Sequence, residues 1–290
     1  MFGSRIPAAK TERRGRRRRS PAALIGAGLA FQALLIVFTL LYVNVPPGFN
    51  VPYGLSVQSV GLFRRLWSYP SLSLSADTLS TAAALTVLAL WVVYGAAALL
   101  VSRRPTGARP REVFVVLGFA CLYNIELAVL LPPILSADVF HYALFGRMVA
   151  FYGLNPYVVP GSAISHDPFW SFAVWHDITT QYGPVWTLVS AAAAAVGGDS
   201  VLLTTLTFKG VAALCNLAGA ALVLLLARRL TGGDGVRPLL LYAWNPLILI
   251  ESAGSGHNDV VMIAIALVGL LLATNGRVLS GLAVLLVSAM

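Results

Sequence analysis

The sequence predicts an all-α fold, arranged as the helical bundle of a polytopic membrane protein. The chain is 58% hydrophobic and only 11% charged, whereas about a quarter of the residues in an average soluble protein are charged. Its apolar runs recur at close to twenty residues, the length that crosses ~30 Å of hydrocarbon. We therefore expect an integral, multi-pass protein of the plasma membrane.

The apolar runs predict six complete spans and the beginning of a seventh. The arginine-bearing links 103–111, 228–237 and 275–277 mark the cytoplasmic side. The expected spans are 22–44, 80–102, 112–133, 201–228, 237–253 and 259–274, with another beginning at 278. Residues 22–290 then form a single transmembrane domain. Its last apolar run stops at residue 290 without a polar flank, which indicates a domain that is incomplete at its C-terminus.

Residues 1–21 form a basic tail. Positions 1–19 hold eight basic residues and one acidic residue, so +7 of the net charge of +9 lies there. A cytoplasmic anchor beside the first span accounts for this charge, so we expect a cytoplasmic N-terminus and no nucleic-acid partner. The next apolar run is too long for a cleavable signal peptide. Both cysteines fall inside predicted spans, so we expect neither a disulfide framework nor a thiolate metal site.

The segment 184–198 decides the topology of the second half. Its sequence, "PVWTLVSAAAAAVGG", is shorter than the ~20 residues of a usual span. Counting it as a span would move the basic link 228–237 to the outside, so we predict a helix that lies on the outer surface or dips in partway. This choice leaves outer loops at 45–79 and 134–200, and an outer turn "AGSGHND" at 253–259.

Ionisable side chains gather at the predicted outer face. All four histidines and most of the aspartates fall there, whereas the cytoplasmic links are mainly basic. The outer residues are His141, His166, His176, His257, Asp77, Asp138, Asp167, Asp177, Asp199 and Asp259. This asymmetry predicts chemistry at the outer face.

The first dense patch is "SADVFHYALFGRMVAFYGLNPY", 136–157. On a helix from about 137 to 152, Asp138, His141 and Tyr142 share one face. Arg147 lies nine positions after Asp138, so it is expected to face headgroups or another partner. The Asp138 carboxylate can be a general base for a hydroxyl group or merely the N-cap of a surface helix. The local sequence leaves both readings open.

The second patch is "WNPLILIESAGSGHNDVVM", 244–262. Asp259 can cap the following helix, but capping explains only one of its polar residues. We expect Glu251, His257, Asn258 and Asp259 to take part in binding. The same topology predicts that the outer turn lines one cavity with Asp138, open both to water and sideways to lipid.

Two charged residues lie deeper in the expected spans. Lys209 and Glu126 each sit ~11–12 Å below the outer surface at ~1.5 Å per residue. Unpaired ions are expensive at that depth, so each needs a partner or a water-lined cavity. They either pair with one another, or Lys209 faces a lipid phosphate. The sequence leaves both arrangements open.

Together, these patches carry a family resemblance. The 136–157 stretch, followed by "QYGPVWTL", is similar to the polyprenyl-phosphate-mannose-dependent α-1,6-mannosyltransferases of bacterial lipomannan synthesis, members of the GT-C class. The 244–262 stretch resembles their later conserved segment. The resemblance covers roughly residues 112–275. It implies a GT-C-like bundle with surface helices in the outer loop 134–200, and it identifies Asp138 with the catalytic aspartate of that loop.

The resemblance implies an inverting membrane glycosyltransferase. It would move a hexose, with mannose the sugar implied, from a polyprenyl-phosphate donor to a glycan or glycolipid acceptor at the outer face. Membrane lipid is the other expected partner. The donor-binding candidates are His141, Tyr142, Arg147, Lys209, Glu251, His257, Asn258 and Asp259.

The resemblance also implies a donor without a nucleotide, which agrees with the absence of a phosphate-cradling motif from the sequence. No metal ligands and no cofactor are assigned, and the participation of a divalent cation stays open. The main rival is a lipid or solute transporter or flippase, which would usually show paired broken helices in two repeated halves.

Overall fold

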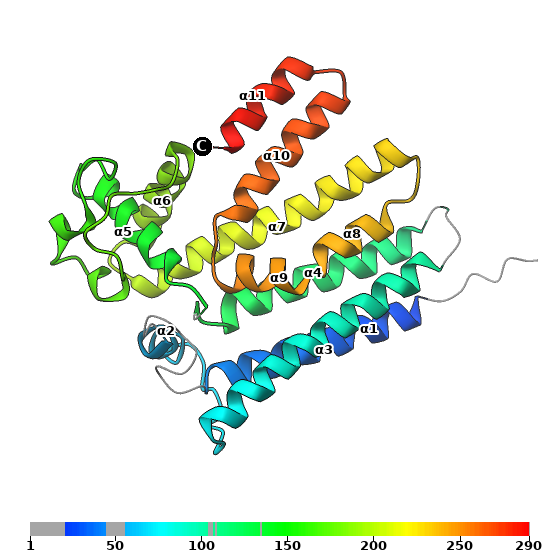
Figure 1. Ribbon diagram of the computed structural model, residues 1–290, viewed down its shortest axis with the longest axis horizontal. Coiled ribbons are helices and arrows are strands. Elements are labelled where there is room, and N and C mark those ends of the chain that lie inside the picture. Colours follow the sequence, from blue (N-terminus) through cyan, green and yellow to red (C-terminus); the bar gives the residue numbers. More distant parts are fainter. Residues whose placement is uncertain (1–20, 45–55, 104–106, 108, 134, 290) are drawn as a thin grey trace, which may run out of the picture.

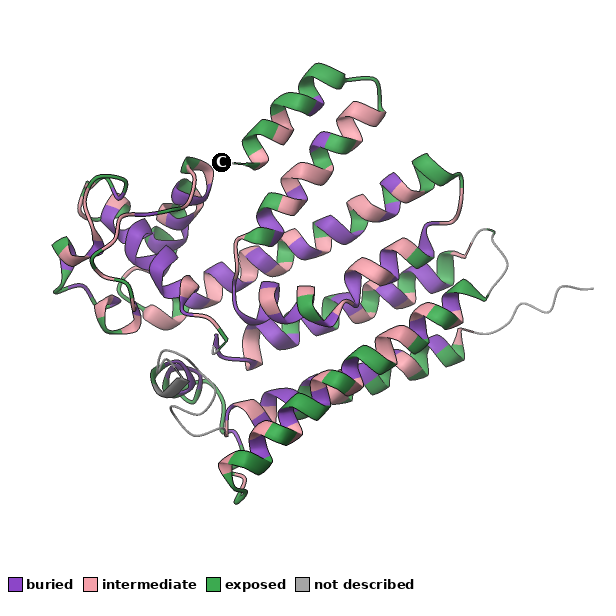
Figure 2. Ribbon diagram, viewed as in Figure 1, coloured by how far each residue is buried: buried purple, intermediate pink, exposed green. Residues whose placement is uncertain are grey.

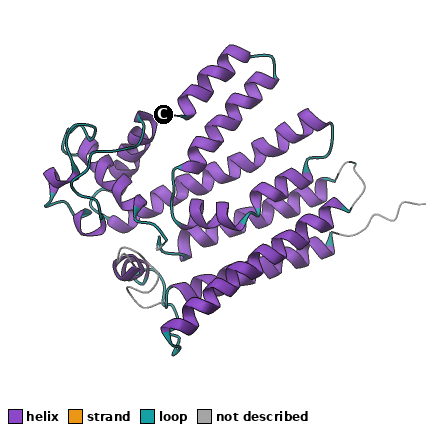
Figure 3. Ribbon diagram, viewed as in Figure 1, coloured by secondary structure: helices purple, strands orange, loops and turns teal. Residues whose placement is uncertain are grey.

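The computed structural model describes residues 21–44, 56–103, 107, 109–133 and 135–289, and in these ranges every regular element is a helix (Figure 3). The expected basic tail lies almost entirely outside the described residues. The longer helices are α1 (Ala22–Tyr42), α3 (Ala76–Ser102), α4 (Pro110–Leu130), α5 (Asp138–Ala150), α6 (Pro184–Gly197), α7 (Val201–Thr231), α10 (Asp259–Thr274) and α11 (Val278–Ser288). The short ones are α2 (Ser56–Phe63), α8 (Val236–Ala243), α9 (Pro246–Leu249), the 3₁₀ turns Gly161–Ile164 and Trp170–Phe172, and the π-helical turn Ile250–Gly254.

Within the described residues, four helices are long and apolar enough to cross a membrane, and they lie where four of the spans were expected. These are α1, α3, α4 and α7, of 21, 27, 21 and 31 residues. They run side by side, with burial concentrated on their facing sides and on α5 (Figures 1 and 2). Helix α3 begins at Ala76, earlier than expected, because Ser75 caps it by accepting a hydrogen bond from the Thr78 N–H.

The expected continuous span at 237–253 is wrong. The chain instead forms α8, then α9 and a π-helical turn, with the break at Asn245–Pro246. Proline lacks the N–H that a continuing helix needs but suits a first helical position. Asn245 accepts hydrogen bonds from the N–H groups of Leu247 and Ile248 and so starts α9 afresh. A bend of 113° then separates the 246–254 segment from α10, and this bent pair would make a fifth span if counted as one.

Helix α6 occupies the segment 184–198, which the sequence analysis judged too short to span a membrane. It has 14 residues and packs against α5 at the end of the bundle where α7 begins (Figure 1). Gly146 permits this packing, because a Cβ there would overlap the Ser190 carbonyl. The structure thus places 184–197 at one end of the bundle.

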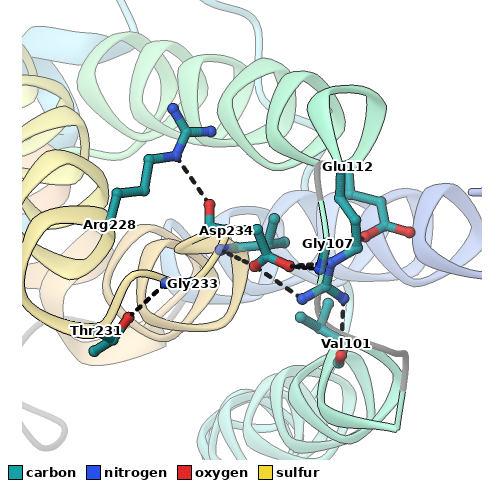
Figure 4. A network of polar contacts seen from close by, with 9 residues as sticks. Val101, Gly107, Glu112, Arg228, Thr231, Gly233 and Asp234 are labelled. Atoms are coloured by element: carbon teal, nitrogen blue, oxygen red, sulfur yellow. Dashed lines mark hydrogen bonds and ion pairs between the residues drawn. The ribbon is translucent and has the colours of Figure 1, made fainter.

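The opposite end of the bundle is held by polar contacts between two links. The Arg109 guanidinium donates from Nε and Nη2 to the two Asp234 carboxylate oxygens at 2.7 and 2.9 Å, and Gly107 N–H also points to Asp234 (Figure 4). Burial by itself would raise the Asp234 pKa, but the Arg109 and Val236 N–H bonds outweigh it and hold that pKa below its ordinary value. Arg229 binds the Thr274 carbonyl at the same end. The basic links therefore share one end, as predicted.

Which side of the membrane each end faces can be tested with engineered cysteines. In a background with Cys121 and Cys215 replaced by alanine, a cysteine at the exposed position Thr231 should resist a membrane-impermeant thiol reagent in intact cells, because its end is basic. A cysteine at exposed Ser165 should label rapidly. Labelling at position 231 but not at position 165 would show that the protein has the opposite orientation in the membrane.

Candidate active site

Asp138 is the first residue of α5 and does not cap it. Ala137 holds the N-cap position, and no side chain makes a capping bond there. The Asp138 side chain is 23% exposed, so its carboxylate remains reachable at the mouth of the bundle. Its backbone N–H is bound by the Ser136 hydroxyl at 3.1 Å, which fixes the start of the helix. The carboxylate is therefore available for a role other than capping.

The outer turn brings a histidine and two further carboxylates to Asp138. His257 Nε2 lies 4.0 Å from Asp138 Oδ2 and 3.7 Å from Glu251 Oε2, and its Nδ1 lies 3.6 Å from Asp259 Oδ2. Asp259 begins α10, but its side chain makes no capping bond either. We call Asp138, Glu251, His257 and Asp259 the outer cluster. It joins the two patches that the sequence predicted to meet.

The π-helical turn Ile250–Gly254 helps to fix the position of His257 next to Glu251. The backbone N–H of His257 bonds to the Glu251 carbonyl at 3.1 Å, so the cluster's histidine and glutamate are held in one wide turn. Gly256 has φ +79°, which strains any side-chain-bearing residue, and a Cβ there would stand 3.3 Å from a Val139 methyl group. A π-helical turn is an uncommon element that is often found at functional sites.

A hydrogen bond locks the turn to α5. The Tyr142 hydroxyl donates to Asn258 Oδ1 at 3.1 Å, and the Tyr142 ring stands edge-on to Tyr182 with 4.8 Å between ring centroids. Burial raises the pKa of both tyrosines, and the Asp138 charge raises each further. Both hydroxyls therefore stay protonated. Tyr182 borders the outer cluster and was missed from the sequence, although "QYGPVWTL" contained it.

His141 faces the outer loop instead of the cluster. Its Nε2 accepts hydrogen bonds from the N–H groups of Val174 and Trp175 at 3.1 and 2.7 Å, and Nδ1 lies 3.4 Å from the Ala137 carbonyl. This arrangement requires a neutral ring with the proton on Nδ1. Burial lowers the His141 pKa, which favours the same form. His141 therefore anchors the outer loop through both of its ring nitrogens.

Arg147 is also a structural anchor. Its guanidinium donates to Asp167 Oδ2 at 2.6 Å, to Asp199 Oδ1 at 2.7 Å and to the Gly198 carbonyl at 2.5 Å. The Arg147 side chain is 3% exposed and that of Asp167 is fully buried. Protein oxygens bind all three guanidinium nitrogens, so Arg147 meets another partner, as its spacing allowed, in an internal ion pair.

Lys209 and Glu126 do not pair with one another within the described residues. The Lys209 ammonium donates to the Leu131 carbonyl and lies 4.9 Å from the centre of the Phe63 ring. It is fully buried, so it ties the chain ahead of Asp138 to α7 instead of facing lipid. Neither carboxyl oxygen of Glu126 has a hydrogen-bond partner in the described part of the chain. We have no physical account of why an acid is placed there.

An apolar cavity of about 310 Å³ opens beside the outer cluster. Helices α1 and α3 form one wall, and the α9 segment forms the other. Glu251, which lies 3.7 Å from His257, also lines this cavity and so connects it to the cluster. The other lining residues are Phe38, Tyr42, Ser80, Ala83, Ala84, Val87, Trp91, Leu135, Pro246, Leu247 and Ile250.

The described residues were also compared with the side-chain arrangements that bind metal ions. Among the described residues, no group of three or more histidine, cysteine, aspartate or glutamate side chains is arranged to hold an ion. We therefore assign no metal ligands.

Comparison with known protein families assigns this chain to one family. Residues 28–290 match the family described as alpha-(1->6)-mannopyranosyltransferase, N-terminal domain. The chain belongs to this family. The family expected from the two motifs is thereby confirmed, and so is the all-helical membrane class that goes with it.

Curated members of the family are moderately similar to the chain. Alpha-(1->6)-mannopyranosyltransferase A of Mycobacterium tuberculosis is 29% identical over 165 residues, which cover 54% of this chain and 30% of that protein. The enzyme of the same name from Corynebacterium glutamicum is 30% identical over 164 residues, covering 54% and 32%. The chain thus spans about a third of the length of these relatives. No solved structure matches the chain.

The Arg147 anchor gives a stability prediction. Replacing Arg147 by methionine removes the partner of a buried carboxylate, a change that costs about 3 kcal/mol in comparable buried pairs. We expect a lower midpoint for thermal unfolding in detergent and faster proteolysis of the 160–183 loop. Adding Asp167→Asn should recover part of the loss, because the uncompensated charge is then gone. An unchanged midpoint in the single variant would show that the ion pair contributes little.

Proposed function

We propose that the chain is the N-terminal part of a glycosyltransferase that moves mannose from a polyprenyl-phosphate donor to a glycan or glycolipid acceptor at the outer face, with inversion. The observation that carries this proposal is the meeting of Asp138 and His257, 4.0 Å apart, beside an apolar cavity in a member of a mannosyltransferase family. The family relationship supports mannose, and the geometry supports a lipid-linked donor.

The proposed base is Asp138. Its carboxylate would take the proton of an acceptor hydroxyl as that oxygen attacks the anomeric carbon of the donor. The carbon–oxygen bond to phosphate breaks, and polyprenyl phosphate leaves with the bonding electrons. A single displacement converts a β-linked donor into an α-linked product. General base catalysis by a positioned carboxylate typically contributes a factor of about 10² to 10⁴.

The rest of the outer cluster would orient the two substrates. Among the described residues, His257 is the basic side chain that forms an ion pair with Asp138. Its Nε2 atom has no hydrogen-bond partner in the same part of the chain. We assign it to the donor phosphate, whose negative charge grows as the bond breaks. Glu251 and Asp259 can accept hydrogen bonds from sugar hydroxyls. Tyr142 and Asn258 hold the turn that carries these groups.

The cavity beside Glu251 would hold the first part of the polyprenyl chain. A lipid-linked donor cannot leave the bilayer without exposing apolar surface, at about 0.8 kcal/mol per CH₂ group. One wall of the cavity is formed by α1 and α3, which are long enough to span a membrane, and the cavity reaches the outer cluster at Glu251. The donor can therefore keep its tail in hydrocarbon while its phosphate meets His257.

A transporter is the weaker alternative. Transporters commonly build their sites from paired broken helices in two repeated halves. One bent pair, 246–254 with α10, occurs within the described residues, and it has no counterpart in α1 to α4. The broken segment instead supplies Glu251 and His257 to the outer cluster.

The base assignment is tested with the full-length protein in membranes, labelled polyprenyl-phosphate mannose and an oligomannoside acceptor. Asp138→Asn should lower the transfer rate by about 10² or more, because an amide cannot accept the proton. Asp77→Asn, a change at an exposed aspartate in the first turn of α3 and outside the outer cluster, should retain normal transfer. If Asp138→Asn kept near-normal turnover, Asp138 would not be the base.

The donor route is tested by filling the cavity. Ala84→Trp should raise the KM for a long-chain polyprenyl donor and have less effect on a short-chain analogue, because the added ring occupies space near the tail. Leu88→Trp, a change on the same helix at an exposed position outside the cavity lining, is the control. Equal effects of Ala84→Trp on both donors would place the tail elsewhere.

A further inference from the structure

Trp175 is held in an exposed position against His141, which lies one helical turn after Asp138 on α5. Its side chain is 40% exposed, and its ring packs on the His141 ring with 4.8 Å between centroids. His141 follows Asp138 by three positions on α5, so the two side chains belong to the same end of that helix. An indole this accessible leaves a broad apolar surface beside a polar site.

The loop that carries Trp175 is rigidly attached. His141 Nε2 accepts hydrogen bonds from both Val174 and Trp175 N–H groups. The next residue, His176, stacks on Trp170 at 3.7 Å between ring centroids, and its carbonyl accepts from Ser162 N–H at 2.7 Å. These backbone contacts do not depend on the Trp175 side chain. The indole is therefore presented in one place, which lowers the entropy lost when a ligand binds.

The same loop continues to the outer cluster. Thr180 N–H bonds to the Pro156 carbonyl at 2.8 Å, and two residues later Tyr182 packs edge-on against Tyr142. The loop 173–183 thus runs from an exposed indole to the tyrosines beside Asp138. Asp177 and Gln181 are exposed between them and offer a carboxylate and an amide.

These features match the chemistry of a sugar ring. A pyranose has a flat C–H face, which an aromatic ring can cover, and a rim of hydroxyl groups that bond to carboxylates and amides. The Asp177 charge disfavours an anionic phosphate headgroup as the occupant, although tryptophan is also common at membrane interfaces. A neutral glycan suits both the ring and the polar rim.

We propose that the loop 173–183 is an acceptor subsite, in which Trp175 stacks on a sugar unit of the acceptor glycan next to the unit that reacts. This inference rests on the proposed function for the position of the reacting hydroxyl at Asp138. It makes Trp175 a specificity-determining residue for the acceptor. The donor, which approaches through the cavity at Glu251, does not contact it.

The test measures acceptor binding apart from transfer. Full-length protein in lipid nanodiscs is titrated with a soluble α-linked mannotrioside, and saturation-transfer NMR follows the sugar protons. Trp175→Ala should weaken binding roughly tenfold, the scale of a lost aromatic contact. Trp175→Phe should retain part of it. Trp67→Ala is the matched control, since Trp67 is 42% exposed and follows α2 outside the loop.

Transfer kinetics give the second arm. Trp175→Ala should raise the KM for the trioside and leave the KM for the polyprenyl donor unchanged. Wild-type trioside binding in Trp175→Ala would overturn the proposal, as would a raised donor KM with an unchanged acceptor KM, which would mark a lipid contact. If neither the wild-type protein nor any variant transfers mannose, the proposed function is wrong. If trioside binding nevertheless depends on Trp175, the subsite proposal is still supported.

Discussion

The hydrogen bond from Tyr142 to Asn258 joins the two parts of the chain on which the candidate site depends. Helix α5 carries Asp138, and the turn before α10 carries His257, more than a hundred residues later. The Tyr142 ring packs against the Tyr182 and Trp186 rings, and a hydrogen bond in such apolar surroundings is stronger than one in water. Gly256 lets the turn approach α5 closely enough for the bond to form. If this contact were lost, the outer cluster would lose the fixed spacing between its aspartate and its histidine.

Around that contact, the protein uses its charged groups in two ways. Arg147 and Lys209 are buried, and protein oxygens bind their charges. Such groups hold loops in place, because an unpartnered ion in an apolar bundle is strongly unfavourable. The outer cluster keeps its carboxylates partly exposed, without short ion pairs. This difference in pairing separates the structural charges from those available to a substrate.

The broken segment between α8 and α10 has a consequence for access to the site. A continuous helix over 237–253 would place its side chains along one straight axis. The break at Asn245 and the bend before α10 instead turn Glu251 toward both the cavity and His257. One local irregularity thus connects the apolar cavity with the outer cluster.

The sequence alone determined the all-helical class, four helices long and apolar enough to span a membrane, the short helix at 184–197 and the two polar patches. Each follows from the length or polarity of a local run, which a hydrocarbon solvent constrains tightly. The tertiary structure decided the rest. Sequence reasoning made Arg147, Lys209 and His141 donor-binding candidates beside the catalytic candidate Asp138, because sequence spacing cannot show which buried oxygen or N–H group each will meet. Their partners Asp167, Leu131 and Trp175 lie 20, 78 and 34 positions away. Only packing brings such distant groups together, and so only packing separates the charges that build the fold from those that face a substrate.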